Sequence, residues 1–411
     1  MPSNRGSLVI DNIGELTTND DAHGGRLRDA AVVIERDRVS WVGPAAHAPA
    51  ADSRFDAGGR ALLPGWVDSH THLVFAGDRT AEFEARMAGE AYAAGGINVT
   101  VEATRAATDA ELTANLARLV EEARSGGTTT LETKTGYGLT VEDERRAAVI
   151  AGRYADAVTF LGAHVVPAGD DPASYLDLVT GPMLDAVAPH VSAVDVFCEE
   201  GAFDEAASRR VLEAAARAGL ASRVHGNQLG HGPGVQLAVS AGSLSVDHLG
   251  FLSDDDVSAL AGSWRAWDGG AGRRGTVATV LPACDLSTRM PLAPARDLLD
   301  AGAVLAIASN ANPGTSYTSS MAFCVATAVL QMRLTVQEAV RAATLGGAIA
   351  LGMESDGWRD PRGDVQGAVG VVRPGARADL HLLDAPSVTH LAYRPGMPLT
   401  HAVWRKGERL L

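Results

Sequence analysis

The pattern of hydrophobic and polar positions changes twice along the chain. Short runs rich in Val, Ile and Leu, separated by Asn, Asp and Gly, fill residues 1–63 and return in residues 369–411. Between them, short apolar runs alternate with Ala-rich stretches whose apolar residues recur with the helical period. The central pattern is typical of repeated βα units, and we expect the two ends of the chain to pair into a small, β-sandwich-like domain.

Eight apolar runs in residues 64–368 are predicted strands. Their sequences are GWVDSHTHLVF, TTTLETKTGYG, AVTFLGAHVVP, SAVDVFCEEGAF, SRVHGNQL, LSVDHLGFL, TVATVLPAC and AVLAIASNANPG. Helical segments separate them, among them VEATRAATDAELTANLARLVEEARSGG, DEAASRRVLEAAARAGL and PLAPARDLLDAG, which reach Gly at or near their ends, as helices often do. Eight such units predict an α/β fold, a (β/α)8 barrel of the TIM type, with residues 354–370 as a loop between it and the terminal β domain.

Polar side chains gather at the predicted strand ends, where a barrel carries its reactive groups. They are His70 and His72 after the first strand, Tyr137 after the second, His164 after the third, His225 after the fifth, His248 after the sixth, and Asn310 and Asn312 after the eighth. Six strands therefore deliver polar groups to one face of the predicted barrel.

The His-x-His pair suggests a metal site. Residues i and i+2 of a strand point the same way, so His70 and His72 project together, and neutral imidazole suits zinc, iron or nickel. Taken alone, the pair fits equally well two buried histidines satisfied by backbone hydrogen bonds. The further histidines at strand ends favour the metal site.

The composition of the chain limits the classes of molecule that it is expected to bind. The formal charge of -15 argues against a nucleic acid or an anionic membrane, but a single buried arginine can still bind a small anion. No signal peptide and no membrane-spanning run is expected. The three cysteines form no C-x-x-C pair and are expected to be packing residues of a cytoplasmic protein. A homodimer is a candidate assembly.

Several stretches resemble a known family. HTHLVFAGDRTAEFEAR, TKTGYGL, TFLGAHVVP, VDVFCEEGAF, VHGNQL, SVDHL and NPGTS resemble the amidohydrolase superfamily and, within it, the imidazolonepropionase family, in the order of that family. H-x-H is generic to the superfamily, whereas GDR, TGYG, LGAH and NPGTS are more specific. The resemblance implies hydrolysis of 4-imidazolone-5-propanoate to N-formimidoyl-L-glutamate in histidine degradation, with one divalent metal ion, zinc or iron.

The resemblance also assigns roles to residues. It implies metal ligands at His70, His72, His225 and Asn310, and substrate-binding residues at Arg79, Tyr137, His164, Gln228, Asn312, Gly314 and Thr315. His248, Gln228 and His164 are the expected catalytic residues. Arg79 would grip the carboxylate of the substrate. Three of these residues also have a simpler interpretation: Arg79 as a surface partner of Glu82 or Glu84, and Tyr137 and Asn312 as turn residues.

Two positions depart from the family. Its aspartate metal ligand is Asn310 here, and Gln228 stands where several relatives carry glutamate. An amide oxygen can face a metal but carries no charge and accepts no proton, so His248 is left as the best proton carrier. Three outcomes stay open: an active enzyme that uses His248, an impaired ligand-binding homologue, or a chain altered at residue 310. Another cyclic amidase or deaminase of the superfamily is the rival activity.

Overall fold

The computed structural model describes residues 6–89, 96–265, 267 and 274–411. The chain forms two compact units. One contains residues up to Asp68, Glu121–Thr130 and Ser320–Leu411, and the other contains Ser69–Val120 and Leu131–Ser319. The domain boundaries expected between residues 63 and 64 and between 368 and 369 remain a prediction.

Eight strands form one sheet in the order in which they occur along the chain. They are β6 (Trp66–Asp68), β7 (Thr128–Lys134), β8 (Ala157–Ala163), β9 (Ala193–Cys198), β10 (Ala221–Gly226), β11 (Ser245–His248), β12 (Val277–Val280) and β13 (Leu305–Ile307). The pairs from β7 to β13 are parallel. The predicted (β/α)8 barrel is therefore confirmed, although all eight strands are shorter than the apolar runs suggested.

The first and last strands of this sheet are joined by the segments that follow them. The Asn310 N–H donates to the His70 carbonyl (3.0 Å), and the His72 N–H donates to the Ala311 carbonyl (2.9 Å). These bonds close the barrel at a seam. His70 and His72 lie just beyond β6 rather than in it, and the seam bonds hold their backbone in place of a strand ladder.

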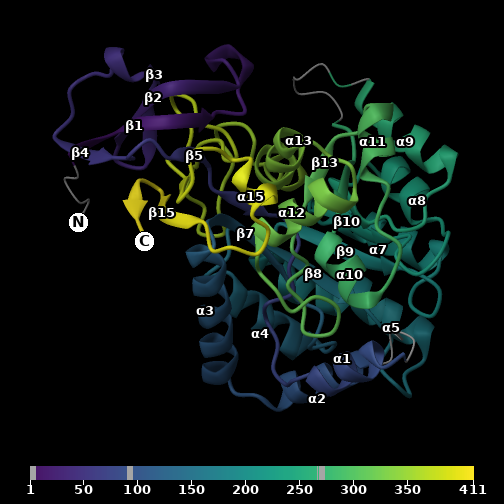
Figure 1. Cartoon of the computed structure of the whole chain (residues 1–411). Coiled ribbons are helices and arrows are strands. Elements are labelled where there is room, and N and C mark those ends of the chain that lie inside the picture. The colour runs from purple at the N-terminus through teal and green to yellow at the C-terminus, as the bar shows by residue number, and fades with distance from the viewer. Residues whose placement is uncertain (1–5, 90–95, 266, 268–273) are drawn as a thin grey trace. The chain divides into compact units, whose positions relative to one another are not determined.

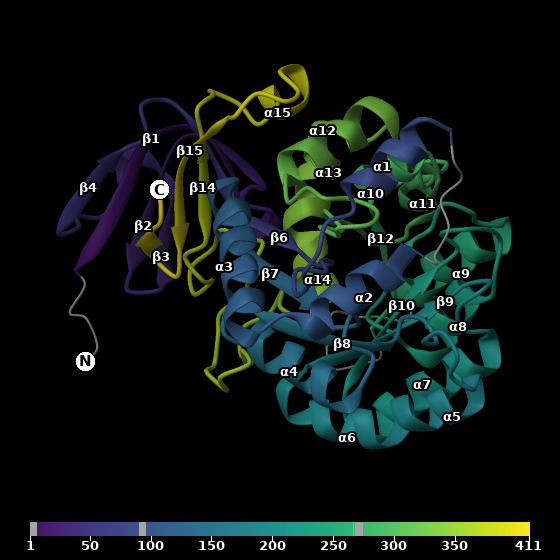
Figure 2. The same ribbon diagram turned by 90° about the horizontal axis from the view of Figure 1, so that it is seen from below.

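Helices alternate with the barrel strands along the chain, and those of residues 141–265 lie outside the strands in Figure 2. The α-helices of both units have the following bounds. They are α1 (Thr80–Met87), α2 (Ile97–Ala106), α3 (Asp109–Ser125), α4 (Val141–Ala151), α5 (Pro172–Leu178), α6 (Leu184–Val187), α7 (Glu205–Arg217), α8 (Gly234–Ala241), α9 (Asp254–Arg265), α10 (Pro282–Thr288), α11 (Ala295–Ala301), α12 (Met321–Gln331), α13 (Val336–Arg341), α14 (Gly347–Leu351) and α15 (His390–Tyr393).

One predicted helix is two helices. The segment 101–127 breaks between α2 and α3, where Ala107 takes an extended conformation. Thr108 and Glu111 explain the break: the Thr108 N–H donates to the Glu111 carboxylate (2.8 Å), and the Glu111 N–H donates to the Thr108 hydroxyl oxygen (3.3 Å). This reciprocal pair is a capping box, which starts a new helix.

The two ends of the chain share the second sheet, in the order β16-β15-β14-β5-β1-β2-β3, with β4 also paired to β1 (Figure 1). Its strands are β1 (Ser7–Thr17), β2 (Arg26–Glu35), β3 (Arg38–Pro44), β4 (Ser53–Asp56), β5 (Ala61–Pro64), β14 (Leu380–Leu383), β15 (Thr400–Arg405) and β16 (Glu408–Arg409). Phe55 on β4 meets Trp404 on β15 edge to face, with ring centroids 5.0 Å apart. The sheet thus folds over a common core, as expected for a sandwich-like domain built from both termini.

Among the described residues, no helix is both long enough and apolar enough to cross a membrane.

Candidate active site

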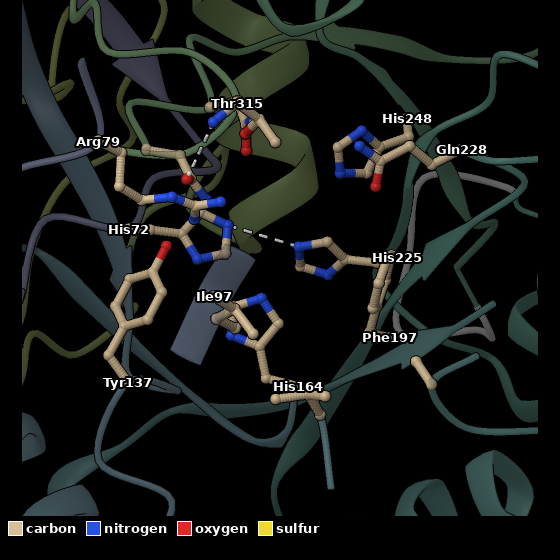
Figure 3. A pocket seen from close by; sticks show the side chains of 14 residues that line it. His72, Arg79, Ile97, Tyr137, His164, Phe197, His225, Gln228, His248 and Thr315 are labelled. Atoms are coloured by element: carbon tan, nitrogen blue, oxygen red, sulfur yellow. Dashed lines mark hydrogen bonds between the residues drawn. The ribbon is translucent and has the colours of Figure 1, made fainter. Parts of the chain in front are cut away.

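Three histidines converge beneath the barrel mouth. The Nε2 atoms of His70 and His72 lie 3.2 Å apart, and those of His72 and His225 lie 3.5 Å apart. All three side chains are buried. The i, i+2 spacing of the first two and the position of the third at the end of β10 produce this arrangement, so the sequence-predicted cluster does assemble (Figure 3).

Two carboxylates that the sequence analysis missed orient these rings. The Nδ1–H of His70 donates to Asp247 (2.7 Å), and the Nδ1–H of His225 donates to Asp195 (3.1 Å). With the proton on Nδ1, each Nε2 presents a lone pair to the common centre. Burial is the main reason that the pKa of both His70 and His72 falls well below its usual range, which keeps these imidazoles neutral.

The geometry fits a divalent metal ion. Nitrogen ligands at about 2.0–2.1 Å from tetrahedral zinc lie about 3.3 Å from one another, close to the two separations found here. Unprotonated nitrogens this close repel one another unless a cation lies between them. The hydrogen-bonded carboxylate behind the imidazole is the usual support of a metal ligand. His70, His72 and His225 are therefore suited to hold such an ion.

A buried ion network lies behind the histidines. The Lys134 ammonium is 3.0 Å from a carboxylate oxygen of Glu132 and 3.0 Å from one of Asp195. Burial alone would lower the pKa of Lys134, but these two carboxylates raise it, so the lysine is charged. Glu132 also accepts the backbone N–H of Thr71, between the two histidines of the pair (3.1 Å). The network thus ties β7 and β9 to the segment that carries His70 and His72.

Asn310 faces the same cavity. Its Nδ2 donates to the Thr315 hydroxyl oxygen (2.8 Å), whereas its Oδ1 is buried without a hydrogen-bond partner. An orphaned buried carbonyl oxygen is costly unless a cation or a ligand meets it. The residue has a φ of 58°, a conformation that asparagine tolerates better than most residues. Its amide oxygen is therefore available to a metal or a substrate, without the charge of an aspartate.

His248 and Gln228 lie on the opposite side of the cavity from Tyr137 (Figure 3). Burial is the main cause that lowers the pKa of His248 well below its usual range, so this imidazole is a neutral proton acceptor. Cys284 lies behind both residues, with its sulfur 3.9 Å from His248 Nδ1 and 3.8 Å from Gln228 Nε2. Glu199 holds the backbone of Gln228 by accepting its N–H (2.5 Å).

His164 and Tyr137 form another wall. The Nδ1–H of His164 donates to the Gly136 carbonyl (2.9 Å), which leaves Nε2 as an acceptor. Burial lowers the pKa of His164 to about 4, so this acceptor persists at neutral pH. The two rings lie 5.4 Å apart, and the Tyr137 hydroxyl points toward the region between Arg79 and His72 (Figure 3).

Arg79 is buried and paired at the same time. Its Nε donates to Glu82 (2.8 Å), and its Nη2 donates to the same carboxylate (2.6 Å). The ion pair considered from sequence therefore exists, yet Arg79 also lines the cavity. Gly314 packs on the other edge, because a Cβ there would lie 2.0 Å from Nη1. Glycine at this position is thus a condition for the guanidinium to sit where it does.

The cavity is lined by residues that follow several different barrel strands. Most of the predicted site residues line it: His72, Arg79, Tyr137, His164, His225, Gln228, His248, Asn310, Asn312 and Thr315. Two predicted residues do not. His70 lies beneath the cavity, and Gly314 lines a neighbouring one together with Arg79. Asn312 also has the turn role considered for it, because its side-chain oxygen accepts the Gly314 N–H (2.8 Å).

The fold and the site define a class of protein: a (β/α)8 barrel with a histidine cluster that is suited to hold a metal ion. The model of the amidohydrolase family matches residues 61–410. The chain therefore belongs to the amidohydrolase family.

Two relatives that match nearly the whole chain are both named imidazolonepropionase. The imidazolonepropionase of Arthrobacter sp. (strain FB24) is 68% identical over 405 residues, covering 98% of this chain and 99% of the relative. The imidazolonepropionase of Saccharopolyspora erythraea is 67% identical over 404 residues, covering 98% of this chain and 99% of the relative.

Solved structures share the fold at low identity. An adenosine deaminase from Xanthomonas campestris with bound zinc has a TM-score of 0.70 at 19% identity and covers 98% of this chain and 92% of its own. The atrazine chlorohydrolase from Arthrobacter aurescens TC1, complexed with zinc, has a TM-score of 0.68 at 16% identity, covering 98% and 95%.

Proposed function

We propose that the chain is an imidazolonepropionase: a metal-dependent hydrolase that opens the cyclic amide of 4-imidazolone-5-propanoate to give N-formimidoyl-L-glutamate in histidine degradation. The relatives at 67–68% identity over nearly the whole chain carry this proposal. The cavity supports it, since one wall offers neutral imidazoles and another a buried arginine.

The substrate is a five-membered ring with a carboxylate tail, and the cavity has a group for each part. Arg79 binds the carboxylate, because a guanidinium is matched in charge and shape to it. His164 Nε2 accepts a hydrogen bond from a ring N–H of the substrate. Because the imidazole is neutral and its proton is on Nδ1, Nε2 can only accept. Tyr137, Asn312 and Thr315 contact the polar edges of the ring and its tail, and Gly314 supports Arg79 from behind.

His70, His72, His225 and the Asn310 amide oxygen would hold one divalent ion, zinc or iron. Such an ion supplies Lewis-acid activation of a water molecule and of the ring carbonyl. His248 accepts the proton that the water loses and returns it to the ring nitrogen as the C–N bond breaks, because it is neutral and borders the cavity. Gln228 beside it donates a hydrogen bond rather than a proton.

The cellular setting is part of the proposal. Cys198, Cys284 and Cys324 are all buried and unbridged, which suits the reducing cytoplasm. The partner is a small molecule with a carboxylate, and a homodimer is the candidate assembly.

Replacing Arg79 tests the substrate assignment. We expect Arg79→Gln to raise KM for 4-imidazolone-5-propanoate at least about ten-fold, because hydrogen bonds to a charged group contribute about 1.5–3 kcal/mol. Arg209→Gln is the matched control, since Arg209 pairs with Glu205 on α7 (2.7 Å). Steady-state kinetics and metal content are measured together on each protein.

An unchanged KM in Arg79→Gln would show that Arg79 does not bind the substrate carboxylate. It would favour another cyclic amidase or deaminase activity of the same family. The lost charge at residue 310 gives a second candidate, a ligand-binding homologue with impaired catalysis. Substrate binding by a metal-poor wild-type protein without turnover would favour that candidate.

A further inference from the structure

A short loop carries one wall of the cavity. It runs from Gly136 to Leu139, between β7 and α4, and contains Tyr137. Gly136 has a φ of 109° and Leu139 a φ of 55°. Leucine rarely adopts a positive φ, so interactions outside the loop must stabilise this conformation.

Those interactions come from one carboxylate. Glu144, in the first turn of α4, accepts the backbone N–H of Gly136 on one oxygen (3.0 Å). Its other oxygen accepts the N–H of Gly138 (2.8 Å) and of Leu139 (2.7 Å). Three of the four N–H groups of the loop thus converge on a side chain that is fully buried.

This carboxylate has an unusual environment. Burial raises the pKa of Glu144, and the hydrogen bonds from Thr135 and the loop oppose that rise. A buried carboxylate is costly unless its hydrogen bonds are satisfied. The loop N–H groups meet that need, so the loop conformation and the carboxylate depend on each other.

The loop in turn reaches the reacting side of the cavity. The Gly136 carbonyl accepts the Nδ1–H of His164 (2.9 Å). The backbone is also packed tightly at this point, since a Cβ on Gly136 would lie 2.7 Å from the Leu161 carbonyl oxygen. A small displacement of the loop would therefore break the bond to His164 and shift Tyr137.

We propose that Glu144 is a positioning residue of the active site. By holding Gly136, Gly138 and Leu139, it keeps the Gly136 carbonyl on His164, which fixes the Nδ1–H tautomer and turns Nε2 to the ligand. The same bonds keep Tyr137 facing the cavity. The inference rests on the proposed function only for the identity of the ligand.

The isosteric variant Glu144→Gln is the sharpest probe. The amide oxygen can keep the bonds from Gly138 and Leu139, but the amide nitrogen then faces the Gly136 N–H, donor against donor. We expect kcat/KM for 4-imidazolone-5-propanoate to fall about ten- to hundred-fold, chiefly through KM. We also expect His164 to show a mixture of tautomers in 15N NMR spectra, with its signals assigned by comparison with His164→Asn.

Asp256→Asn is the matched control. Asp256 is a buried carboxylate in the first turn of α9 that accepts the Ser253 N–H (3.0 Å), and it does not line the cavity. We expect this variant to lower the melting temperature without a change of KM or of the His164 signals. Metal content and melting temperature are measured for both variants.

Two results would overturn the proposal. One is a Glu144→Gln protein with wild-type KM and an unchanged His164 spectrum. The other needs no variant: a wild-type His164 that carries its proton on Nε2. If the wild type does not turn over imidazolonepropanoate, the proposed function fails, and the NMR result still decides the role of Glu144.

Discussion

At the scale of single residues, the positions of the imidazole protons determine how the histidines of the site can act. Asp247 and Asp195 fix the Nδ1 protons of His70 and His225, and the Gly136 carbonyl fixes that of His164. Each bond leaves an Nε2 lone pair directed toward the cavity or the metal position. The hydrogen-bond acceptors at Nδ1 thus determine that each Nε2 is free to bind a metal ion or to accept a hydrogen bond.

The amide at residue 310 gives a prediction at this scale. We expect Asn310→Asp to retain metal at least about ten-fold better in competition with a chelator, because a carboxylate adds an opposite charge beside a buried divalent ion. The Thr315 hydroxyl, which now accepts from Asn310, can reverse and donate to the new carboxylate. Metal content and turnover are measured side by side.

Asn115→Asp is the control for the added charge, since Asn115 binds the Phe75 carbonyl (3.0 Å) and does not line the cavity. Equal retention of metal by Asn310→Asp and the wild type would mean that an amide suffices at this position.

The sequence alone could identify the histidines but not their supports. The His-x-His spacing predicted that His70 and His72 project together, although both lie beyond β6. Arg79, Tyr137 and Gln228 came from motifs. Asp195, Asp247 and Glu144 were missed because a carboxylate in a sequence is expected at the surface. The one available signal was a charged residue within an otherwise apolar strand, as in VDVF and SVDH.

At the scale of elements, periodicity located the eight strands but not their limits. Several cavity-lining side chains lie at or just beyond strand ends, and the apolar pattern does not mark these ends. The break between α2 and α3 was overlooked because the helical period continues across it, whereas the capping box that causes it is a local signal.

Packing of α14 on β6 gives a prediction at this scale. A Cβ on Gly347 would lie 2.3 Å from the Val67 carbonyl oxygen, so Gly347→Ala must push helix and strand apart. We expect it to lower the free energy of unfolding by about 1–3 kcal/mol, measured by urea denaturation.

Gly262→Ala provides the control on the helix α9, because nothing lies within 4 Å of the added Cβ. We expect that variant to stabilise the protein by up to about 1 kcal/mol, since alanine favours the helix over glycine. A Gly347→Ala protein as stable as the wild type would contradict the tight approach.

At the scale of the whole molecule, both units bury neutral histidines. Burial lowers the pKa of His164 to about 4 and that of His381, on β14, to about 3. Unfolded histidine has a pKa near about 6.5, so below that pH the unfolded chain binds more protons than the folded one. Stability is therefore complete above about pH 6.5 and falls as the pH drops toward the folded values.

His381→Gln tests this linkage. We expect the slope of unfolding free energy against pH, between about pH 6 and 4, to decrease by up to one proton, or about 1.4 kcal/mol per pH unit. Urea titrations at several pH values give this slope for each protein. The slopes, and not the absolute free energies of unfolding, are compared between the variant and the wild type. His47→Gln, at an exposed histidine, is the control, and an unchanged slope in His381→Gln would refute the assignment.

The seam of the barrel has a consequence for synthesis of the protein. The ribosome makes His70 and His72 long before Asn310 and Ala311, whose backbone bonds lock that pair in place. A cation that met the nascent chain early would find two imidazoles on an unanchored segment. We therefore expect a divalent ion to bind only after Asn310 and Ala311 have been synthesised, and a chain truncated before residue 310 to carry no metal at this site.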